Sequence, residues 1–235
     1  MQEWYPNTKE ELKSVLEEFL SQKTSIKQKQ IHGLIVPHAG YAYSGKIAGK
    51  AFSLIKNLKN KKAVILGPSH YAAFNRVAVM QKTETPLGKI KIPENNFPKL
   101  QYEHSVDNQI PFLQKLGFTE ILPLVIGQIS LKDAEEIAKM LIKNYPDYIY
   151  IFSTDLSHFF EYETAVKKDK NSIDIITNTD ESKLNNLDAC GFYPLLILLQ
   201  LCKLKSWKPE LIEYKNSGDI TGDKSQVVGY ACLYF

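Results

Sequence analysis

Three short apolar segments of this chain each run into a polar loop that carries a histidine. They are residues 34–36 before His38, residues 63–66 before His70 and residues 148–152 before His158. Apolar runs without alternation are typical of strands buried on both faces of a parallel sheet. The carboxyl ends of parallel strands meet at one edge, where α/β proteins bind ligands. Because imidazole ligates metals and transfers protons near neutral pH, this placement predicts one shared site.

Any one of these histidines alone has a simpler interpretation, as a loop side chain bonded to the backbone. Three at equivalent places favour a shared functional site. Asp155 stands in the same loop as His158. Glycine and proline around His38 and His70 permit tight turns and a close approach of the backbone to a ligand. His32 precedes its predicted strand, so we expect it at the opposite rim.

His104 is a fourth candidate, in the segment 103–113, where apolar residues recur at helical spacing. A helix is predicted to begin near Glu103 and His104. The carboxylates of Glu103 and Asp107 fit two interpretations equally well, as caps that accept hydrogen bonds from free backbone N–H groups or as functional groups. His104 is predicted to face the substrate or to support the ligands.

The three cysteines divide by their surroundings. Cys190 stands just before a predicted apolar helix, residues 195–203, and a helix N-terminus favours the thiolate form of a nearby thiol. It is therefore a candidate ligand or nucleophile. Cys202 and Cys232 fit small core residues. An odd count without a close pair excludes a disulfide framework and a zinc ribbon.

Composition places the chain among ordinary globular proteins. Its 235 residues are 44% hydrophobic, and 29 basic against 26 acidic side chains give a net charge of +3. This length fits a single domain, residues 1–235, with a large core. The scattered charges predict no nucleic-acid partner. The longest apolar run, residues 195–201, is too short to span a membrane, so we expect a cytoplasmic protein with reduced thiols.

The pattern of apolar residues predicts an α/β fold with a mainly parallel central sheet flanked by helices. Strands are expected at 34–36, 63–66, 120–126 and 148–152, and helices at 8–20, 44–58, 131–144 and in two stretches after residue 160. Residues 77–80 and 89–92 are expected to pair as an antiparallel insertion. Residues 211–214 and 227–235 are expected to form a closing hairpin around a turn at 218–223.

Six segments of the chain, in order, resemble the Memo family. They are Pro-His-Ala-Gly-Tyr-Ala-Tyr-Ser-Gly at 37–45, Gly-Pro-Ser-His at 67–70, Glu-His-Ser-Val-Asp-Asn-Gln-Ile-Pro-Phe-Leu at 103–113, Ser-Thr-Asp-Leu-Ser-His at 153–158, Ala-Cys-Gly at 189–191 and Val-Val-Gly-Tyr-Ala at 227–231. The resemblance covers nearly the whole chain. Two features depart from the family pattern: only three residues precede Trp4, and Asp107 stands where glutamate is more usual.

The resemblance implies a fold similar to that of the class III extradiol dioxygenases, non-haem iron enzymes that open catechol rings. It implies His38 and His70 as two metal ligands, with Cys190 where the dioxygenases have a carboxylate. His158 matches their acid/base histidine, with Asp155 beside it. The family is described as binding iron or copper. Its bacterial and archaeal members are associated with a radical S-adenosylmethionine partner protein.

A thiolate in place of a carboxylate changes the chemistry of such a site. Two imidazoles and a carboxylate suit Fe(II), whereas two imidazoles and a thiolate are softer and shift the preference toward copper or zinc. A cysteine ligand is also readily oxidised where O₂ is activated. Ring cleavage is therefore less expected than the fold implies, because a fold alone does not define a reaction.

Three functions from different classes remain open on the sequence. The leading hypothesis is a metal-binding, redox-active protein in which His38, His70 and Cys190 hold iron or copper, with zinc as an alternative, while His158, Asp155 and His104 move protons or orient groups. The second is a non-catalytic module for a peptide or acidic ligand, walled by Trp4, Tyr41, Tyr43 and Tyr71. The third is metal-free hydrolysis by Cys190 or Ser69 with His158 and Asp155, although the chain has no Gly-x-Ser-x-Gly elbow.

Overall fold

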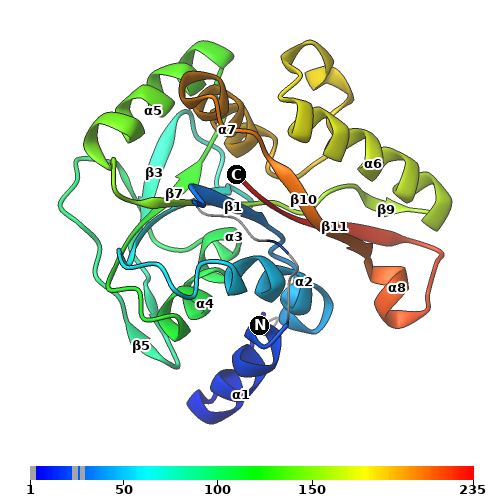
Figure 1. The fold of residues 1–235 in the computed structure, drawn as a ribbon, viewed down its shortest axis with the longest axis horizontal. Coiled ribbons are helices and arrows are strands. Elements are labelled where there is room, and N and C mark those ends of the chain that lie inside the picture. The colour runs from blue at the N-terminus through cyan, green and yellow to red at the C-terminus, as the bar shows by residue number, and fades with distance from the viewer. Residues whose placement is uncertain (1–3, 23–25, 27–29) are drawn as a thin grey trace.

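Four parallel strands form the centre of the structure, a computed structural model that describes residues 4–22, 26 and 30–235. In order across the sheet they are β1 (Gly33–Val36), β8 (Ile149–Ser153), β2 (Lys62–Pro68) and β7 (Glu120–Ile126). All four are buried along almost their whole length. Their carboxyl ends therefore lie along one edge of the sheet (Figure 1).

Shorter or antiparallel strands complete the sheet on both sides. Next to β1 lie β11 (Val227–Tyr234) and β10 (Glu210–Asn216), both in antiparallel pairings, and β9 (His158–Phe160) pairs with β11. Next to β7 lie β3 (Val77–Met80), antiparallel, and then β6 (Lys99–Leu100). β4 (Glu84–Thr85) and β5 (Gly88–Lys89) form a separate two-residue pairing.

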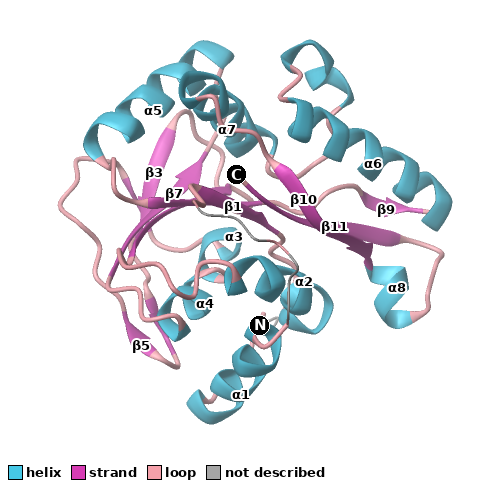
Figure 2. Ribbon diagram, in the orientation of Figure 1, coloured by secondary structure: helices cyan, strands magenta, loops and turns pink. Residues whose placement is uncertain are grey.

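Helices cover both faces of the sheet, which gives three layers (Figure 2). The helices are α1 (Lys9–Leu20), α2 (Tyr41–Ser53), α3 (His104–Asp107), α4 (Ile110–Lys115), α5 (Leu131–Asn144), α6 (Tyr162–Asn178), α7 (Phe192–Lys205) and α8 (Ser217–Thr221), with the 3₁₀ helix η1 (Glu181–Asn186). One core packs α5, α6 and α7 against the sheet, and the other packs α1, α2, α3 and α4 against its opposite face. Adjacent residues of one strand supply both cores: Ile35 faces the first and Leu34 the second.

Local sequence explains where the helices begin. Thr8 accepts a hydrogen bond from the backbone N–H of Glu11, as in a capping box, and its hydroxyl donates to the Glu11 carboxylate at 2.7 Å. Ser130 and Asp133 make a complete capping box at the start of α5. α7 is apolar on all sides and buried over most of its length, because it packs on both α5 and the sheet.

The predicted α/β fold with a mainly parallel central sheet is confirmed. The predicted bounds of β3, β7 and α5 agree with the structure, and those of the other central strands are within two residues. The helix predicted at 44–58 begins three residues earlier, at Tyr41, and ends at Ser53. None of the described helices is both long and apolar enough to cross a membrane.

One prediction about connections is wrong, and another is confirmed except for its turn. Residues 77–80 do not pair with 89–92: β3 is buried and lies in the main sheet, where its backbone pairs with β7 along one edge and with β6 along the other. The predicted closing hairpin is formed by β10 and β11, but its turn contains the short helix α8, which begins with a capping box between Asn216 and Asp219 and is capped by Gly222. Gly222 has φ 82°, a left-handed conformation that glycine adopts without strain.

Candidate functional site

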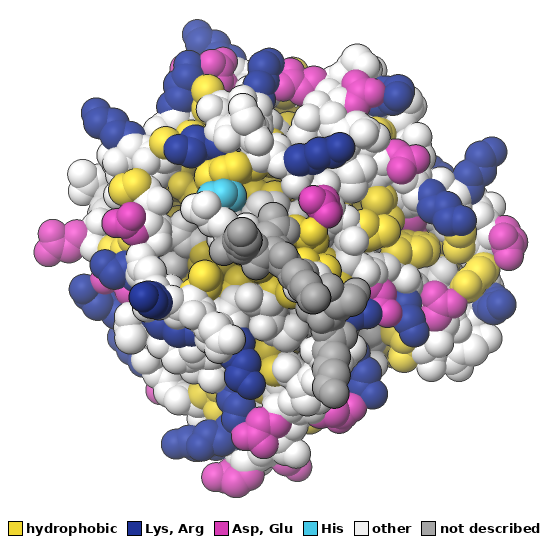
Figure 3. Space-filling model, viewed as in Figure 1, with side chains coloured by type: hydrophobic (Ala, Val, Ile, Leu, Met, Phe, Trp, Pro, Cys, Tyr) yellow, Lys and Arg dark blue, Asp and Glu magenta, His cyan; other side chains and the backbone are white. Residues whose placement is uncertain are grey.

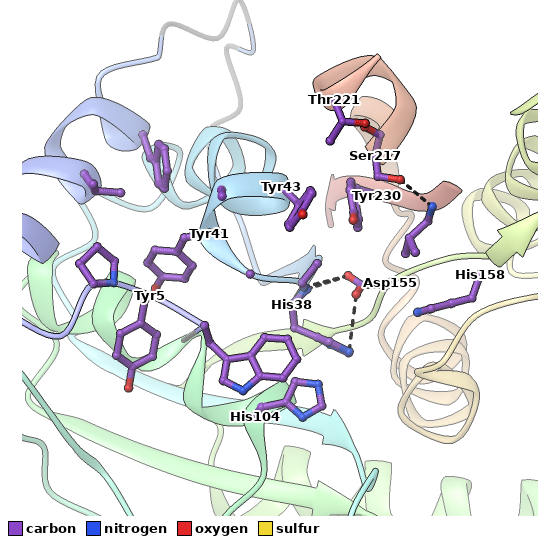
Figure 4. A pocket seen from close by; sticks show the side chains of 18 of the residues that line it. Tyr5, His38, Tyr41, Tyr43, His104, Asp155, His158, Ser217, Thr221 and Tyr230 are labelled. Carbon is purple, nitrogen blue, oxygen red and sulfur yellow. Dashed lines mark hydrogen bonds and ion pairs between the residues drawn. The ribbon is translucent and has the colours of Figure 1, made fainter. Parts of the chain in front are cut away.

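The loops that follow β1, β2 and β8 converge on a crevice with a volume of about 1070 Å³. All four predicted histidines, His38, His70, His104 and His158, line it together with Asp155. Trp4 and Tyr5 from the N-terminal segment, Tyr41 and Tyr43 from α2, and Tyr230 from β11 add aromatic walls. Figure 4 shows His38, His104 and Asp155 near the centre of the crevice, with His158 farther along it.

His38 is held in one tautomer. Its Nδ1 lies 3.0 Å from Ser153 Oγ, whose single hydrogen is donated to the carbonyl of Ser105 at 2.5 Å. Ser153 Oγ therefore accepts from His38 Nδ1–H, as it also does from Gln109 Nε2 at 2.9 Å. The lone pair of His38 is left on Nε2. Burial lowers the pKa of His38 well below its usual value, and the nearby imidazoles of His70 and His104 lower it further, so the ring is neutral.

His70 is fixed in the same way by a carboxylate. Glu103 is fully buried and accepts from the His70 backbone N–H at 2.6 Å, from His70 Nδ1–H at 3.0 Å and from the Ser105 N–H at 3.2 Å. Although burial opposes it, the adjacent His104 and the hydrogen bonds from His70 keep the pKa of Glu103 well below its usual range. Gly67 makes this approach possible, because a Cβ there would lie 2.5 Å from Ser105 Oγ. In the neutral ring of His70 the lone pair is therefore on Nε2.

His104 lies beneath the N-terminal segment and beside the other two imidazoles. The indole of Trp4 stacks on its ring, with centroids 4.2 Å apart and planes 10° apart. His104 Nδ1 is 3.0 Å from Glu103 Oε1, but it is not aligned for a hydrogen bond and has no other partner. Ring nitrogens of His38, His70 and His104 all lie within 4.8 Å of one another, a spacing that fits three ligands of one metal ion after small shifts.

Cys190 lies on the other side of His38. Its Sγ is 3.3 Å from His38 Nε2, and it accepts a hydrogen bond from the Asp155 backbone N–H at 3.2 Å. Gly191 brings this loop close, since a Cβ there would lie 2.5 Å from the side chain of Thr154. A nitrogen at about 2.1 Å and a sulfur at about 2.3 Å on one tetrahedral ion lie about 3.6 Å apart, which is near the observed separation.

The expected lowering of the Cys190 pKa by the α7 N-terminus is wrong. Burial raises the pKa of the Cys190 thiol well above its usual value, and the nearby Asp155 carboxylate raises it further. Cys190 precedes the N-cap residue Gly191, so it does not sit in the first turn of the helix. A divalent cation is the kind of partner that deprotonates such a thiol.

Asp155 and His158 complete the crevice with separate roles. Asp155 Oδ1 accepts from the backbone N–H groups of His38 at 2.8 Å and Ala39 at 3.4 Å, so this carboxylate holds the loop after β1 and is not bonded to His158. His158 Nδ1 lies 2.8 Å from the carbonyl of Leu156 and must donate to it. The free lone pair of His158 is therefore on Nε2, as a proton acceptor requires.

The structure does not support the arrangement needed for metal-free hydrolysis. Ser69 Oγ donates to the carbonyl of Ala72 at 2.6 Å, and Cys190 contacts His38 and Asp155. Neither side chain has a hydrogen bond to His158 among the described contacts. The raised pKa of Cys190 also disfavours a free thiolate nucleophile.

Three supporting residues were not identified as such from the sequence. Ser153 fixes the tautomer of His38, Glu103 fixes that of His70, and Asp169 accepts from the backbone N–H of Ser157, next to His158, at 2.9 Å. Glu103 adjoins His104 in sequence, so a cap or functional role was already weighed for it. No local pattern identifies Ser153 or Asp169, since their partners come from other elements.

The remaining cysteines and histidine lie elsewhere, as predicted. Cys202 and Cys232 are buried in the two cores, and all three cysteines are free thiols. His32 stacks on Trp207 and lines a different pocket, at the amino ends of the strands. On the face drawn in Figure 3, acidic and basic side chains are interspersed, without one large patch of either sign.

Comparison with known proteins matches almost the whole chain to one family. The profile described as "Memo-like protein" matches residues 2–234. A "MEMO1 family protein" of Sulfurisphaera tokodaii is 36% identical over 231 residues, covering 86% of this chain and 81% of the relative. Proteins with the same name from Aquifex aeolicus and Pyrobaculum arsenaticum are 34% and 32% identical, each covering 99% of this chain and 96% and 95% of the relative.

Proposed function

The chain belongs to the Memo family, whose fold is of the extradiol dioxygenase type, and on that premise we propose that its crevice binds a redox-active metal ion, iron or copper, through His38, His70 and Cys190. Zinc is the redox-inactive alternative. The observation that carries the proposal is the state of the two histidines. Each donates Nδ1–H to a buried acceptor, Ser153 or Glu103, and therefore has its lone pair on Nε2, which in His38 lies 3.3 Å from Cys190 Sγ.

The surrounding side chains fit a cation. Glu103 is a fully buried carboxylate bonded to one ligand histidine, which is the usual support for an imidazole on a metal. Asp155 adds a second buried carboxylate, with Oδ2 3.9 Å from His38 Nε2. A bound iron or copper ion would supply Lewis acidity and one-electron redox chemistry at this point. A thiolate is a softer ligand than a carboxylate, so this ligand set favours copper more than a carboxylate-containing set would.

The protein's own residues would position the substrate and move protons. His158, with Nε2 free, accepts a proton from a group bound beside the metal site and returns it. Asp155 holds the loop of His38 in place through two backbone N–H groups. Trp4 covers His104 and keeps water away from that side of the histidines.

His104 is the competing third ligand. Ring nitrogens of the three histidines lie within 4.8 Å of one another, and this group does not include Cys190. Cys190 Sγ, however, lies 3.3 Å from His38 Nε2. We favour Cys190 because the separation of Sγ from His38 Nε2 matches two ligands of one ion, and because the stack on Trp4 restrains the His104 ring.

Metal content tests the proposal and separates the two ligand sets. Protein loaded with Fe(II) under anaerobic conditions and desalted should retain one equivalent, and His38→Ala and Cys190→Ala should retain almost none. His32→Ala and Cys202→Ala are matched controls outside the crevice and should bind as the unaltered protein does. Loss in His104→Ala with retention in Cys190→Ala would assign the third ligand to His104. Unchanged stoichiometry in both His38→Ala and Cys190→Ala contradicts the proposal.

A second candidate function is non-catalytic ligand binding in the same crevice. The aromatic side chains of Trp4, Tyr41 and Tyr43 along its walls favour it. This function predicts ligand binding that is unchanged by a chelator and by Cys190→Ala. Ligand binding that requires the metal supports the first function.

A further inference from the structure

The crevice extends beyond the histidines into an outer arm. We define the outer arm by Tyr43 of α2, His158 and Phe159 of β9, Asp223 after α8, and Tyr230 of β11, all of which line the crevice. Ser217 and Thr221 of α8 lie at its far side (Figure 4). A substrate that reaches the metal site from this direction places its remote group in the outer arm.

The described lining of the crevice has a one-sided set of charges. Its 25 residues include no lysine or arginine, although about three would be expected from the 29 in this chain of 235. The carboxylates are Glu11, Glu18, Asp155 and Asp223. Glu18 pairs with Lys46 at 2.8 Å, but the other three have no lysine or arginine within ion-pair distance among the described residues. The potential here favours a cation and repels an anion.

Aromatic side chains in the outer arm add a second attraction for cations. Tyr43 is 46% exposed and Phe159 is 67% exposed, so their rings are open to a ligand. Burial raises the pKa of the Tyr230 hydroxyl, and the charges of Asp155 and Tyr43 raise it further. Ammonium groups bind aromatic faces through the ring quadrupole.

The backbone conformation of Phe159 is a separate observation about the outer arm. Its φ is 62°, in the left-handed region that costs a residue with a side chain about 1–2 kcal/mol. This conformation directs a large apolar ring to solvent, where it gains little packing within the protein. Strain of this kind is typical of ligand-contacting positions.

The N-terminus of α2 points at the crevice and would favour an anion, but acceptor groups of the protein already bind backbone N–H groups there. Asp155 accepts from the backbone N–H groups of His38 and Ala39, just before the helix. The carbonyl of Trp4 accepts from Tyr41 N–H at 2.8 Å. The positive end of the helix is therefore neutralised internally, and Asp223 remains as the carboxylate of the outer arm without a lysine or arginine partner among the described residues.

We infer that the outer arm is a subsite for an organic cation, and that the substrate carries an ammonium group beside an aromatic ring. This inference rests on the proposed function, since it names the substrate class of the same crevice. It departs from the acidic ligand considered for a binding module, which would meet Asp155 and Asp223 without a basic partner in the described lining.

Two probes of nearly the same shape and opposite charge test the inference. Tyramine ends in an ammonium group, and 3-(4-hydroxyphenyl)propionate ends in a carboxylate. Ligand-observed NMR titrations of the metal-free and Fe(II)-loaded full chain should show tyramine binding at least about tenfold more tightly. The preference should shrink as sodium chloride is raised, because exposed charges are screened.

Three variants locate the effect. Asp223→Asn should reduce the preference to within about threefold, and Tyr43→Leu should weaken tyramine binding by about threefold or more. Asp174→Asn, on the exposed side of α6, is the matched control and should leave the preference unchanged. Equal binding of the two probes, or tighter binding of the propionate, overturns the inference, as does an undiminished preference in both Asp223→Asn and Tyr43→Leu.

Failure of this inference and failure of the metal site give different results. Retention of iron with no preference for tyramine overturns the substrate class and leaves the metal site intact. A clear preference for tyramine in protein that never retains metal supports the cation subsite and contradicts the proposed function.

Discussion

Two histidine–tryptophan stacks lie at opposite edges of the central sheet and have nearly the same geometry. Trp4 stacks on His104 at 4.2 Å and 10°, and Trp207 stacks on His32 at 4.3 Å and 14°. The first lies at the carboxyl edge, in the crevice, and the second lies at the amino edge. Local packing of the rings therefore does not distinguish a functional histidine from a structural one.

The difference lies in what surrounds each imidazole. His104 adjoins two further histidines and the buried carboxylate of Glu103. Burial and the nearby Lys205 lower the pKa of His32, which has no ion pair with a carboxylate among the described residues. Converging imidazoles with buried carboxylate support make the carboxyl edge a site for a cation. The amino edge provides a matched set of control positions.

The largest expected effect is a difference in the free energy of unfolding between variants of the two tryptophans. Trp207 also packs against Phe235 and Tyr150 and borders a main core, so Trp207→Ala should lower the free energy of unfolding by about 3 kcal/mol. Trp4→Ala should cost about 1 kcal/mol or less, but it should speed the modification of His104 by diethyl pyrocarbonate. Urea unfolding and peptide mass analysis measure the two effects. A larger stability loss in Trp4→Ala would contradict the assignment.

Substitution of one glutamate at each edge of the sheet should affect metal affinity differently. Glu103→Gln removes the charge behind His70 and should weaken metal binding about 10- to 100-fold. Glu120, at the amino end of β7, pairs with Lys91 and Lys62, and Glu120→Gln should change the affinity by less than about twofold. Competition with a chromophoric chelator gives both values. Equal losses in the two variants would show that Glu103 acts only through general stability.

Two tyrosine hydroxyls provide a smaller effect with a pH signature. The Tyr214 hydroxyl donates to the buried carboxylate of Asp169 at 2.7 Å, and Tyr214→Phe should cost about 1.5 kcal/mol at pH 7. Tyr150 makes only a 3.5 Å contact to a backbone carbonyl, so Tyr150→Phe should cost about 0.5 kcal/mol or less.

The sign of the pH dependence follows from Asp169. Burial raises its pKa, so its contribution to stability is present below pH 3.8 and is lost as pH rises through the folded pKa. Tyr214→Phe removes a bond that favours the ionised form, so its cost should be smaller at pH 4 than at pH 7. Denaturant titrations at the two pH values test this, and a larger cost at pH 4 would contradict the assigned bond.

The smallest expected effect concerns two residues in left-handed backbone. Phe159 in the crevice has φ 62°, and Ser206 at the end of α7 has φ 55°. Substitution of either by glycine should raise the free energy of unfolding by up to about 1 kcal/mol. Only Phe159→Gly should weaken tyramine binding. Equal tyramine binding in both variants would place Phe159 outside the ligand site.

The sequence was sufficient for the four central strands, for the long helices and for the positions of the histidines. Unbroken apolar runs identified β7 and β8, helical spacing identified α5, and the strand order then placed His38, His70 and His158 at one edge. These inferences depend on local periodicity and on one general rule of parallel sheets.

Contacts between distant segments could not be predicted. The bond between Glu103 and His70, the Ser153 hydroxyl behind His38 and the stack of Trp4 on His104 join residues 33, 115 and 100 positions apart. The state of Cys190 was misjudged for the same reason, because its burial is set by loops from elsewhere in the chain. Periodicity also gave no sign that β3 joins the main sheet or that a capping box makes α8 a helix.

The absorption spectrum of Co(II)-loaded protein tests the central claim most directly, because a cysteine ligand gives an intense sulfur-to-cobalt band in the near ultraviolet. We predict that the unaltered protein and Cys202→Ala show this band and that Cys190→Ala and His38→Ala lack it. A band that persists in Cys190→Ala, or that is absent from the unaltered protein carrying bound cobalt, would contradict a metal centre built from His38, His70 and Cys190.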